Sequence, residues 1–288
     1  MFARVRNPIR TLAVACVVLA AAAPAGAGLE DQARSAAASS TFNDAAGDAG
    51  AAPDITEVVV SNDAAGTVTM SIAVPGRPQL GFEEAMGVWI NADRSEATGR
   101  FGDDYRLLKF AFGSVFERWD GSDWQLFSPA SLIVRWEGGR LVIIAGRADL
   151  GIADAFDFQA GAVLFAGDDP DGWPSDEAPD FGYWTYQLVF APTLGAAKVL
   201  PARPKAGRLV SVAVPVLSGG KPVDTGTVKC AASIGTKRLT ASTSGLNAGT
   251  AGCAWKLPAA AAGKTLRASV TVTTAGGTAT KAFSVKVR

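Results

Sequence analysis

Apolar and polar residues alternate in short runs along much of the chain. In residues 67–74 (TVTMSIAV) every second side chain is a large apolar one, which is typical of a strand with one buried face. The same period returns in residues 108–112, 132–136, 141–145, 156–158 and 184–190. Turn-forming residues such as Asp120-Gly121-Ser122 separate the runs. Many short strands at this spacing predict a β-sandwich for residues 41–192.

A second group of predicted strands lies nearer the C-terminus, at residues 209–217, 227–233, 251–257, 265–274 and 278–287. The segment 193–206 before it contains Pro201 and Pro204 and no sustained alternation, so we expect a linker there. Residues 207–288 then form a smaller second sandwich of ordinary domain size. No stretch keeps helical periodicity over three turns, and the predicted fold class is all-β.

The first residues are typical of an export signal. Residues 1–10 carry three arginines, residues 11–23 are apolar, and Ala25-Gly26-Ala27 provides a small-x-small cleavage pattern. The apolar run is short for a bilayer span, which needs about 20 residues. A lipoprotein signal at Cys16 is disfavoured because only five residues separate it from Arg10. We therefore predict a signal peptide at 1–27, a disordered lead-in at 28–40, and a secreted protein with no membrane span after cleavage.

Two cysteines remain after such a cleavage, Cys230 and Cys253. Cysteines of an exported protein meet an oxidising compartment, where disulfides form and persist. The two are therefore expected to form a disulfide in the second sandwich, and two buried free thiols are the less favoured alternative.

The zero net charge conceals two oppositely charged halves. Residues 41–197 hold nine basic and 24 acidic side chains, whereas residues 198–288 hold 14 basic ones and a single acid, Asp224. The basic half could contact a polysaccharide or cell-wall polymer, dock electrostatically on the acidic half, or be a solvated surface. Nucleic acid is not expected, because the chain is exported and lacks a basic groove interleaved with aromatic residues.

Aspartates dominate the acidic half, with 17 Asp against seven Glu. They gather in three clusters, at residues 43–54, 91–104 and 168–180. Calcium takes six to eight oxygen ligands, and loops at one end of a sandwich can supply them. We therefore predict at least one calcium ion, while each aspartate taken alone could simply stabilise its own turn.

Several ordered motifs of the acidic half resemble carbohydrate-binding module family nine-like (DOMON-like) sandwiches. These motifs are DAAGD…APDIT at 44–56, VWINAD…ATG…GDDY at 88–105, and APDFGYWTYQL at 178–188. The resemblance implies a jelly-roll-like sandwich, often stabilised by calcium, in a superfamily that binds sugars or haem. It matches at Asp48 and Asp54 and at Asp93 and Asp104; we add Asp180 of the third motif as a metal candidate. Asn91 departs from the pattern, and the absence of histidine disfavours haem.

The basic half resembles a bacterial immunoglobulin-like domain through VKCAA at 228–232 and CAW at 253–255. The two cysteines are closer in sequence than in antibody domains, and Trp255 follows the second instead of lying between them. That order argues against an antibody-type core.

One tryptophan is a candidate ligand platform. Trp173 lies between Gly172 and Pro174 in the Asp-rich loop, where no strand pattern predicts its burial. A flat exposed ring there could stack on a sugar. The alternative is that the ring anchors the loop onto the sandwich.

The absence of histidine excludes Ser-His-Asp and Cys-His catalysis and His-liganded zinc. We predict a secreted, non-catalytic binding protein whose acidic sandwich binds calcium and a glycan, with the basic domain as a spacer or wall contact. A structural cell-surface or matrix protein without a small ligand is the alternative. A glycosidase with paired carboxylates is a third, disfavoured class.

Overall fold

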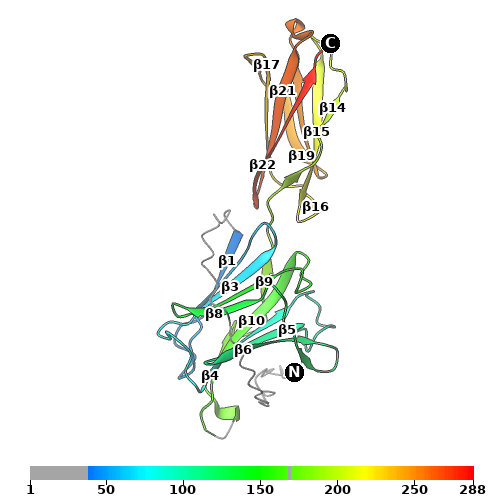
Figure 1. Ribbon diagram of the computed structural model, residues 1–288. Coiled ribbons are helices and arrows are strands. Elements are labelled where there is room, and N and C mark those ends of the chain that lie inside the picture. The colour runs from blue at the N-terminus through cyan, green and yellow to red at the C-terminus, as the bar shows by residue number, and fades with distance from the viewer. Residues whose placement is uncertain (1–37, 168–169) are drawn as a thin grey trace, which may run out of the picture.

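The structure is a computed structural model that describes residues 38–167 and 170–288. Within these residues the chain is all-β, as predicted, and it forms two β-sandwiches arranged end to end (Figure 1). The predicted signal peptide at 1–27 and residues 28–37 of the predicted lead-in lie outside the described residues. In the two described ranges, no helix has the length and apolar character needed to span a membrane.

The first sandwich consists of a five-stranded and a seven-stranded sheet. The five-stranded sheet has the order β1-β2-β3-β9-β8, with β1 (Ala38–Asn43), β2 (Glu57–Asn62), β3 (Thr67–Ala73), β8 (Ile133–Glu137) and β9 (Arg140–Gly146). The seven-stranded sheet has the order β11-β10-β4-β5-β6-β7, and β12 also pairs with β10. Its strands are β4 (Glu84–Asn91), β5 (Tyr105–Phe110), β6 (Gly113–Trp119), β7 (Trp124–Leu126), β10 (Ala155–Leu164), β11 (Ser175–Ala178) and β12 (Trp184–Gln187).

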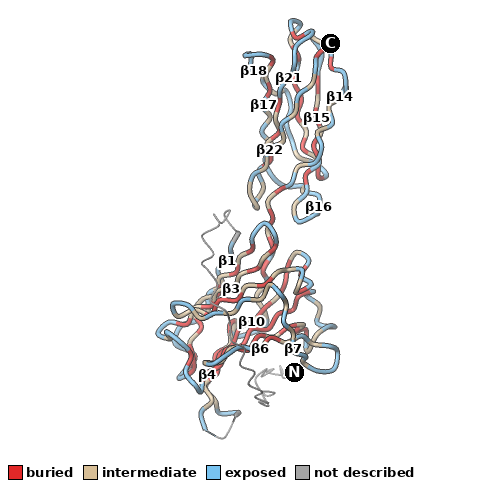
Figure 2. Tube along the Cα trace, in the orientation of Figure 1, coloured by how far each residue is buried: buried red, intermediate tan, exposed pale blue. Residues whose placement is uncertain are grey.

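Alternation builds the core between these sheets. In β2 and β3 every second residue is buried, and Val58, Ile72 and Ile143 meet Val88 and Phe158 of the opposite sheet in one cluster. Burying one face of each strand supplies the main driving force, about 25 cal/mol for each Å² of apolar surface removed from water. In Figure 2 the buried segments lie along the strands, and many of the loops that connect them are exposed.

Strand β4 departs from the alternation, because all eight of its residues are buried. Trp89 faces away from the core, and its indole covers Gly87 on the same strand and Gly161 on β10. A Cβ atom at either glycine would meet that ring, at 3.3 Å for Gly161. The two glycines therefore provide the space in which the tryptophan lies flat.

The second sandwich has its own hydrophobic core, centred on Val214, Trp255 and Val270. A six-stranded sheet with the order β13-β15-β20-β19, to which β14 and β16 add along β15, contains β13 (Thr193–Leu194), β14 (Lys198–Leu200), β15 (Leu209–Ser218), β16 (Lys221–Pro222), β19 (Thr243–Asn247) and β20 (Thr250–Lys256). A four-stranded sheet with the order β18-β17-β21-β22 contains β17 (Thr227–Ile234), β18 (Lys237–Leu239), β21 (Thr265–Thr274) and β22 (Gly277–Lys286). The described residues also contain two short 3-10 turns, η2 (Pro170–Gly172) and η3 (Ala259–Ala261).

Three expectations from sequence need correction. The end of the predicted disordered lead-in, residues 38–40, belongs to β1, which pairs with β2 along its whole length. The predicted linker 193–206 contains β13 and β14, both paired with β15. The predicted strand 108–112 ends at Phe110, because a tight turn there begins the hairpin to β6. Strands of two or three residues and hairpin turns are too short to leave a periodic signal.

The two sandwiches meet at Val189 and Phe190. Asn62 is buried, and its side chain donates to the Val189 carbonyl (2.8 Å) and accepts from the Val189 N–H (2.9 Å). From the second sandwich, the Ser218 hydroxyl donates to the Phe190 carbonyl (2.7 Å). Lys221 of the second sandwich also pairs with Asp154 of the first, with 2.6 Å between Nζ and Oδ2. Hydrogen bonds and one ion pair therefore link the oppositely charged halves.

Candidate metal centre

Five aspartates converge where the loop between β1 and β2 passes the edge strand β11. Asp44, Asp48 and Asp54 lie on the loop, and Asp176 and Asp180 lie on β11 and just after it. The loop folds back on itself, since the Gly47 N–H donates to both carboxylate oxygens of Asp54 (3.0 and 3.1 Å). Gly47 has φ of +90°, a conformation that glycine adopts without strain. This turn brings Asp48 and Asp54 together.

Asp176 joins the loop to the sheet. Its side chain is buried, and Oδ2 accepts a hydrogen bond from the Ile55 N–H at 2.6 Å. One oxygen from each of Asp48, Asp54 and Asp176 lies within 4.8 Å of the other two. Three carboxylates from two segments more than a hundred residues apart in sequence thus face one small volume.

The electrostatics of this group are unfavourable for a cation-free protein. Burial, and then the neighbouring carboxylates of Asp176, Asp180 and Asp48, raise the pKa of Asp44 to about 7. Burial together with Asp48, Asp54 and Asp180 raises the pKa of Asp176 to about 6, although its hydrogen bond from Ile55 acts in the opposite direction. The pKa of each group is above its ordinary value first because burial disfavours the charged carboxylate, and then because neighbouring carboxylates repel it.

The residues fit a hard cation such as calcium. In the part of the chain that the structure describes, none of the five carboxylates forms an ion pair with a basic side chain. The Oδ2 atom of Asp44 is buried and has no hydrogen-bond partner, which normally costs about 1–3 kcal/mol or more. Carboxylate oxygens are the ligands that calcium takes in sets of six to eight. A bound cation would provide both the missing partner and the missing positive charge.

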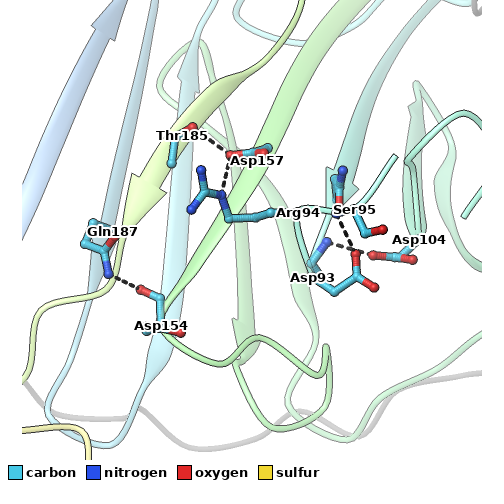
Figure 3. A network of polar contacts seen from close by, with 10 residues as sticks. Asp93, Arg94, Ser95, Asp104, Asp154, Asp157, Thr185 and Gln187 are labelled. Carbon is cyan, nitrogen blue, oxygen red and sulfur yellow. Dashed lines mark hydrogen bonds and ion pairs between the residues drawn. The ribbon is translucent and has the colours of Figure 1, made fainter. Parts of the chain in front are cut away.

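The structure does not bring Asp93 and Asp104 into this group. Both belong to the loop between β4 and β5 (Figure 3). Asp93 accepts from the Ser95 N–H at 2.9 Å and from the Thr98 hydroxyl, and Asp104 accepts from the Ala92 N–H at 2.8 Å. Asp93 stabilises its own turn, the alternative that the sequence left open, and Asp104 joins the two ends of the same loop. Burial raises the pKa of Asp104.

A separate polar network lies beside that loop. The guanidinium of Arg94 contacts Asp157 at 3.1 Å, and the Thr185 hydroxyl donates to the same carboxylate oxygen at 2.6 Å (Figure 3). Arg94 has φ of +60°. The Arg94 side chain thereby attaches the loop between β4 and β5 to Asp157 of β10, which also binds Thr185 of β12.

Trp173 anchors its loop in the structure. The side chain is half-buried, its indole N–H donates to the Gly167 carbonyl at 3.2 Å, and its ring packs edge-on against Phe165 with centroids 5.0 Å apart. These contacts support the loop-anchoring interpretation over an exposed sugar platform.

Sequence reasoning did not single out Asp44 and Asp176, although both fall inside its Asp clusters. A usable signal existed for Asp176: in the short strand Ser175–Ala178 it lies on the same face as Ala178, and both are buried. An aspartate at an inward strand position needs a partner. Asp48, Asp54 and Asp180, which the sequence predicts as metal ligands, all lie close to Asp176 in the structure.

The predicted disulfide between Cys230 and Cys253 is present. It links β17 of the four-stranded sheet to β20 of the six-stranded sheet, with Cα atoms 5.9 Å apart. Trp255, two residues further along β20, is fully buried in the core. The disulfide therefore crosses between the two layers of the second sandwich.

Comparisons with known proteins identify no family. No protein-family model matches the chain, and no curated protein matches it. Among solved structures, it is similar to a titin fragment described as Titin-A168169, at 10% identity over 78% of this chain and 91% of that chain, with a TM-score of 0.27. A chimeric titin Z1Z2 functionalized with a KLER exogenous peptide from decorin matches at 13% identity over 78% and 90%, with a TM-score of 0.25. TM-scores of this size do not indicate a shared arrangement of the whole chain. The two-sandwich fold of this protein is defined by the strand pairing within its own sheets.

Proposed function

We propose that this chain is a secreted, non-catalytic protein whose acidic sandwich binds one calcium ion at Asp44, Asp48, Asp54, Asp176 and Asp180. The observation that carries the proposal is the buried, unpartnered Oδ2 of Asp44 beside three carboxylates whose oxygens lie within 4.8 Å of one another. Such a group is destabilising alone and becomes stabilising around a divalent cation. The disulfide is compatible with an oxidising, extracellular compartment.

The proposed role of the ion is structural. It would join the loop between β1 and β2 to strand β11, two segments that otherwise share the Ile55–Asp176 hydrogen bond. Because β11 is an edge strand of the seven-stranded sheet, the ion would also secure that edge. The resemblance to carbohydrate-binding modules, in which calcium is often structural, supports this role.

Thermal unfolding with and without calcium tests the proposal. For the chain from residue 28 onward, a calcium concentration a hundredfold above the dissociation constant should add about 2.7 kcal/mol to the free energy of unfolding. Asp176→Asn should lose this gain, because it removes a charged ligand while its amide oxygen can still accept from Ile55. Asp93→Asn is the matched control and should keep it. An unchanged transition in calcium would refute the proposed site.

Protein contact in a cell-surface or matrix setting is the second candidate function. Phe82 and Phe181 on loops of the first sandwich are 86% and 89% exposed. A partner protein that covered these side chains would remove their apolar surface from water. This candidate would lead if calcium left the unfolding transition unchanged.

A further inference from the structure

Four segments of the second sandwich meet at its end remote from the first. The Ala206 N–H donates to the Arg288 carbonyl and the Arg288 N–H to the Pro204 carbonyl, both at 2.8 Å, so segment 203–208 pairs with segment 284–288. The Leu257 N–H donates to the Arg208 carbonyl (2.9 Å), which adds segment 256–265. Ile234 pairs with Leu266, which adds segment 234–238. We call these four segments the distal tip; Figure 1 shows it at the top, around the C-terminus.

The distal tip is strongly basic. Its four segments contain nine Lys or Arg residues and no Asp or Glu, and all nine are exposed. None of the nine forms an ion pair within the described ranges. Asp224, the single acid of this half, accepts a hydrogen bond from the Gly249 N–H at 2.9 Å. Gly249 lies against Pro222 of β16, which pairs with the end of β15 nearest the first sandwich. Asp224 is therefore far from the distal tip.

The acidic sandwich does not neutralise this charge. Strands β15 and β21 each span ten residues between the junction and the tip, a length of roughly 30 Å at about 3.3 Å per residue. Exposed charges are screened within about 8 Å at physiological ionic strength. Lys221 and Asp154 make their ion pair at the junction, so the tip presents its positive potential outward.

Two large apolar side chains accompany the cations. Leu209, at the start of β15, is 56% exposed, and Leu200, at the end of β14, is 47% exposed. Leu209 pairs across the sheet with Lys256, and Leu200 pairs with Ser211, two residues from Leu209. Exposed leucines beside unpaired cations combine the two attractions, apolar and electrostatic, that bind proteins to anionic lipid surfaces.

We propose that the distal tip docks on a membrane surface rich in anionic lipid. Its cations come from both sheets and surround the end of an elongated body, which suits a plane of negative charge. This orientation also holds the acidic sandwich away from the surface, where its own negative charge would be repelled. A binding site for a linear polyanion would instead be expected to form a basic stripe along one face of the sandwich.

Vesicle co-flotation tests this proposal with the chain from residue 28 onward, so that the apolar segment 11–23 cannot contribute. The chain should bind vesicles of 70% phosphatidylcholine and 30% phosphatidylglycerol and not vesicles of phosphatidylcholine alone. Binding should fall steeply between 0.05 and 0.5 M salt, values chosen to span about 14 to 4 Å of screening length. Equal binding to the neutral vesicles would overturn the proposal.

Matched charge variants locate the surface. The triple variant Lys205→Gln, Arg208→Gln, Lys256→Gln should weaken binding on the order of a hundredfold, because each basic residue near such a surface contributes about fivefold. The control triple Lys198→Gln, Lys229→Gln, Lys281→Gln removes the same charge from the body of the sandwich, where these residues pair with Ala213, Thr271 and Val270. It should weaken binding by less than about fivefold, since distant charges are screened.

Two outcomes would contradict the assignment. If the control triple weakened vesicle binding as much as the tip triple, net charge and not the tip would be responsible. If the chain bound soluble heparin with the same tip dependence and left the vesicles unbound, the partner would be a polyanionic polymer. Leu209→Ser should weaken vesicle binding further and leave heparin binding unchanged, which separates the two partners independently of charge.

Discussion

Aspartates of this protein have two distinct roles, and their neighbours decide between them. Asp93 accepts from a backbone N–H and a hydroxyl of its own turn, so its charge is locally satisfied. Asp176 accepts a single backbone hydrogen bond, while burial and then three other carboxylates raise its pKa. The sequence predicted that aspartates cluster in three regions, and the structure brings three of the five predicted metal candidates, Asp48, Asp54 and Asp180, close to Asp176. The sequence alone could not predict which aspartates meet in space, because their approach requires β11 to lie beside the loop after β1.

The raised pKa values predict an unusual pH dependence of stability. Without calcium, burial and neighbouring carboxylates raise the pKa of Asp44 to about 7 and the pKa of Asp176 to about 6 in the folded state, from the ordinary value of 3.8 that applies to the unfolded chain. Between these values the folded protein holds more protons than the unfolded one, so its free energy of unfolding should increase as the pH falls from about 7 to about 4. With calcium bound the carboxylates are charged, and acidification should instead release the ion and reduce stability.

Chemical unfolding at pH 7.5, 6.0 and 5.0 measures this dependence, in metal-free buffer and in excess calcium. The two series should slope in opposite directions. In Asp176→Asn the metal-free slope should become shallower, because one titrating group has been removed. If the free energy of unfolding changed with pH in the same way in both buffers, calcium and protons would not compete for these carboxylates, and the prediction would be wrong.

At the scale of strands, alternation predicted several of the strands that have one buried face, but it did not predict β2, whose residues also alternate between part-buried and buried. Strand β3 occupies 67–73 and β21 occupies 265–274, almost as their patterns predict. Strands β13 and β14 escaped prediction because two or three residues cannot show a period. β4 is buried on both faces, so its residues 85–90 form an apolar run that does not alternate with polar residues. Pairing with long neighbours, and not local sequence, creates these elements.

The disulfide between β17 and β20 should stabilise the second sandwich specifically. A cross-link over 23 residues should contribute about 3 kcal/mol through the entropy of the unfolded chain. The double variant Cys230→Ala, Cys253→Ala should lower the urea midpoint of one unfolding transition accordingly. The calcium-dependent transition should keep its midpoint, because the aspartate group lies in the other sandwich. A loss of calcium response in this variant would contradict the separation of the two cores.

At the scale of the whole molecule, the junction fixes how the sandwiches meet. Phe190 receives contacts from both sides, since Arg147 of the first sandwich stacks on its ring at 4.5 Å and Ser218 of the second donates to its carbonyl. A Cβ atom at Gly276 would collide with that carbonyl oxygen. Opposite net charge contributes one ion pair here, Lys221 with Asp154, and packing around Phe190 provides the other contacts.

Gly276→Ala should therefore change the angle between the sandwiches. Small-angle scattering should report an altered maximum dimension, because the second sandwich must shift away from Phe190 to admit the added methyl group. Gly245→Ala is the matched control, since a Cβ atom there meets nothing within 4 Å, and its scattering should equal that of the parent chain. Identical profiles for all three proteins would indicate a junction that does not depend on this packing.

Five aspartates of the first sandwich are proposed to form one calcium site. Isothermal titration of the metal-free chain with calcium tests it most directly, because it counts the ions bound. We predict one ion per chain at pH 7.5, weaker binding at pH 6.0, and no binding in Asp176→Asn, with Asp93→Asn unaffected. Absence of binding in the parent chain, or full binding in Asp176→Asn, would contradict the account.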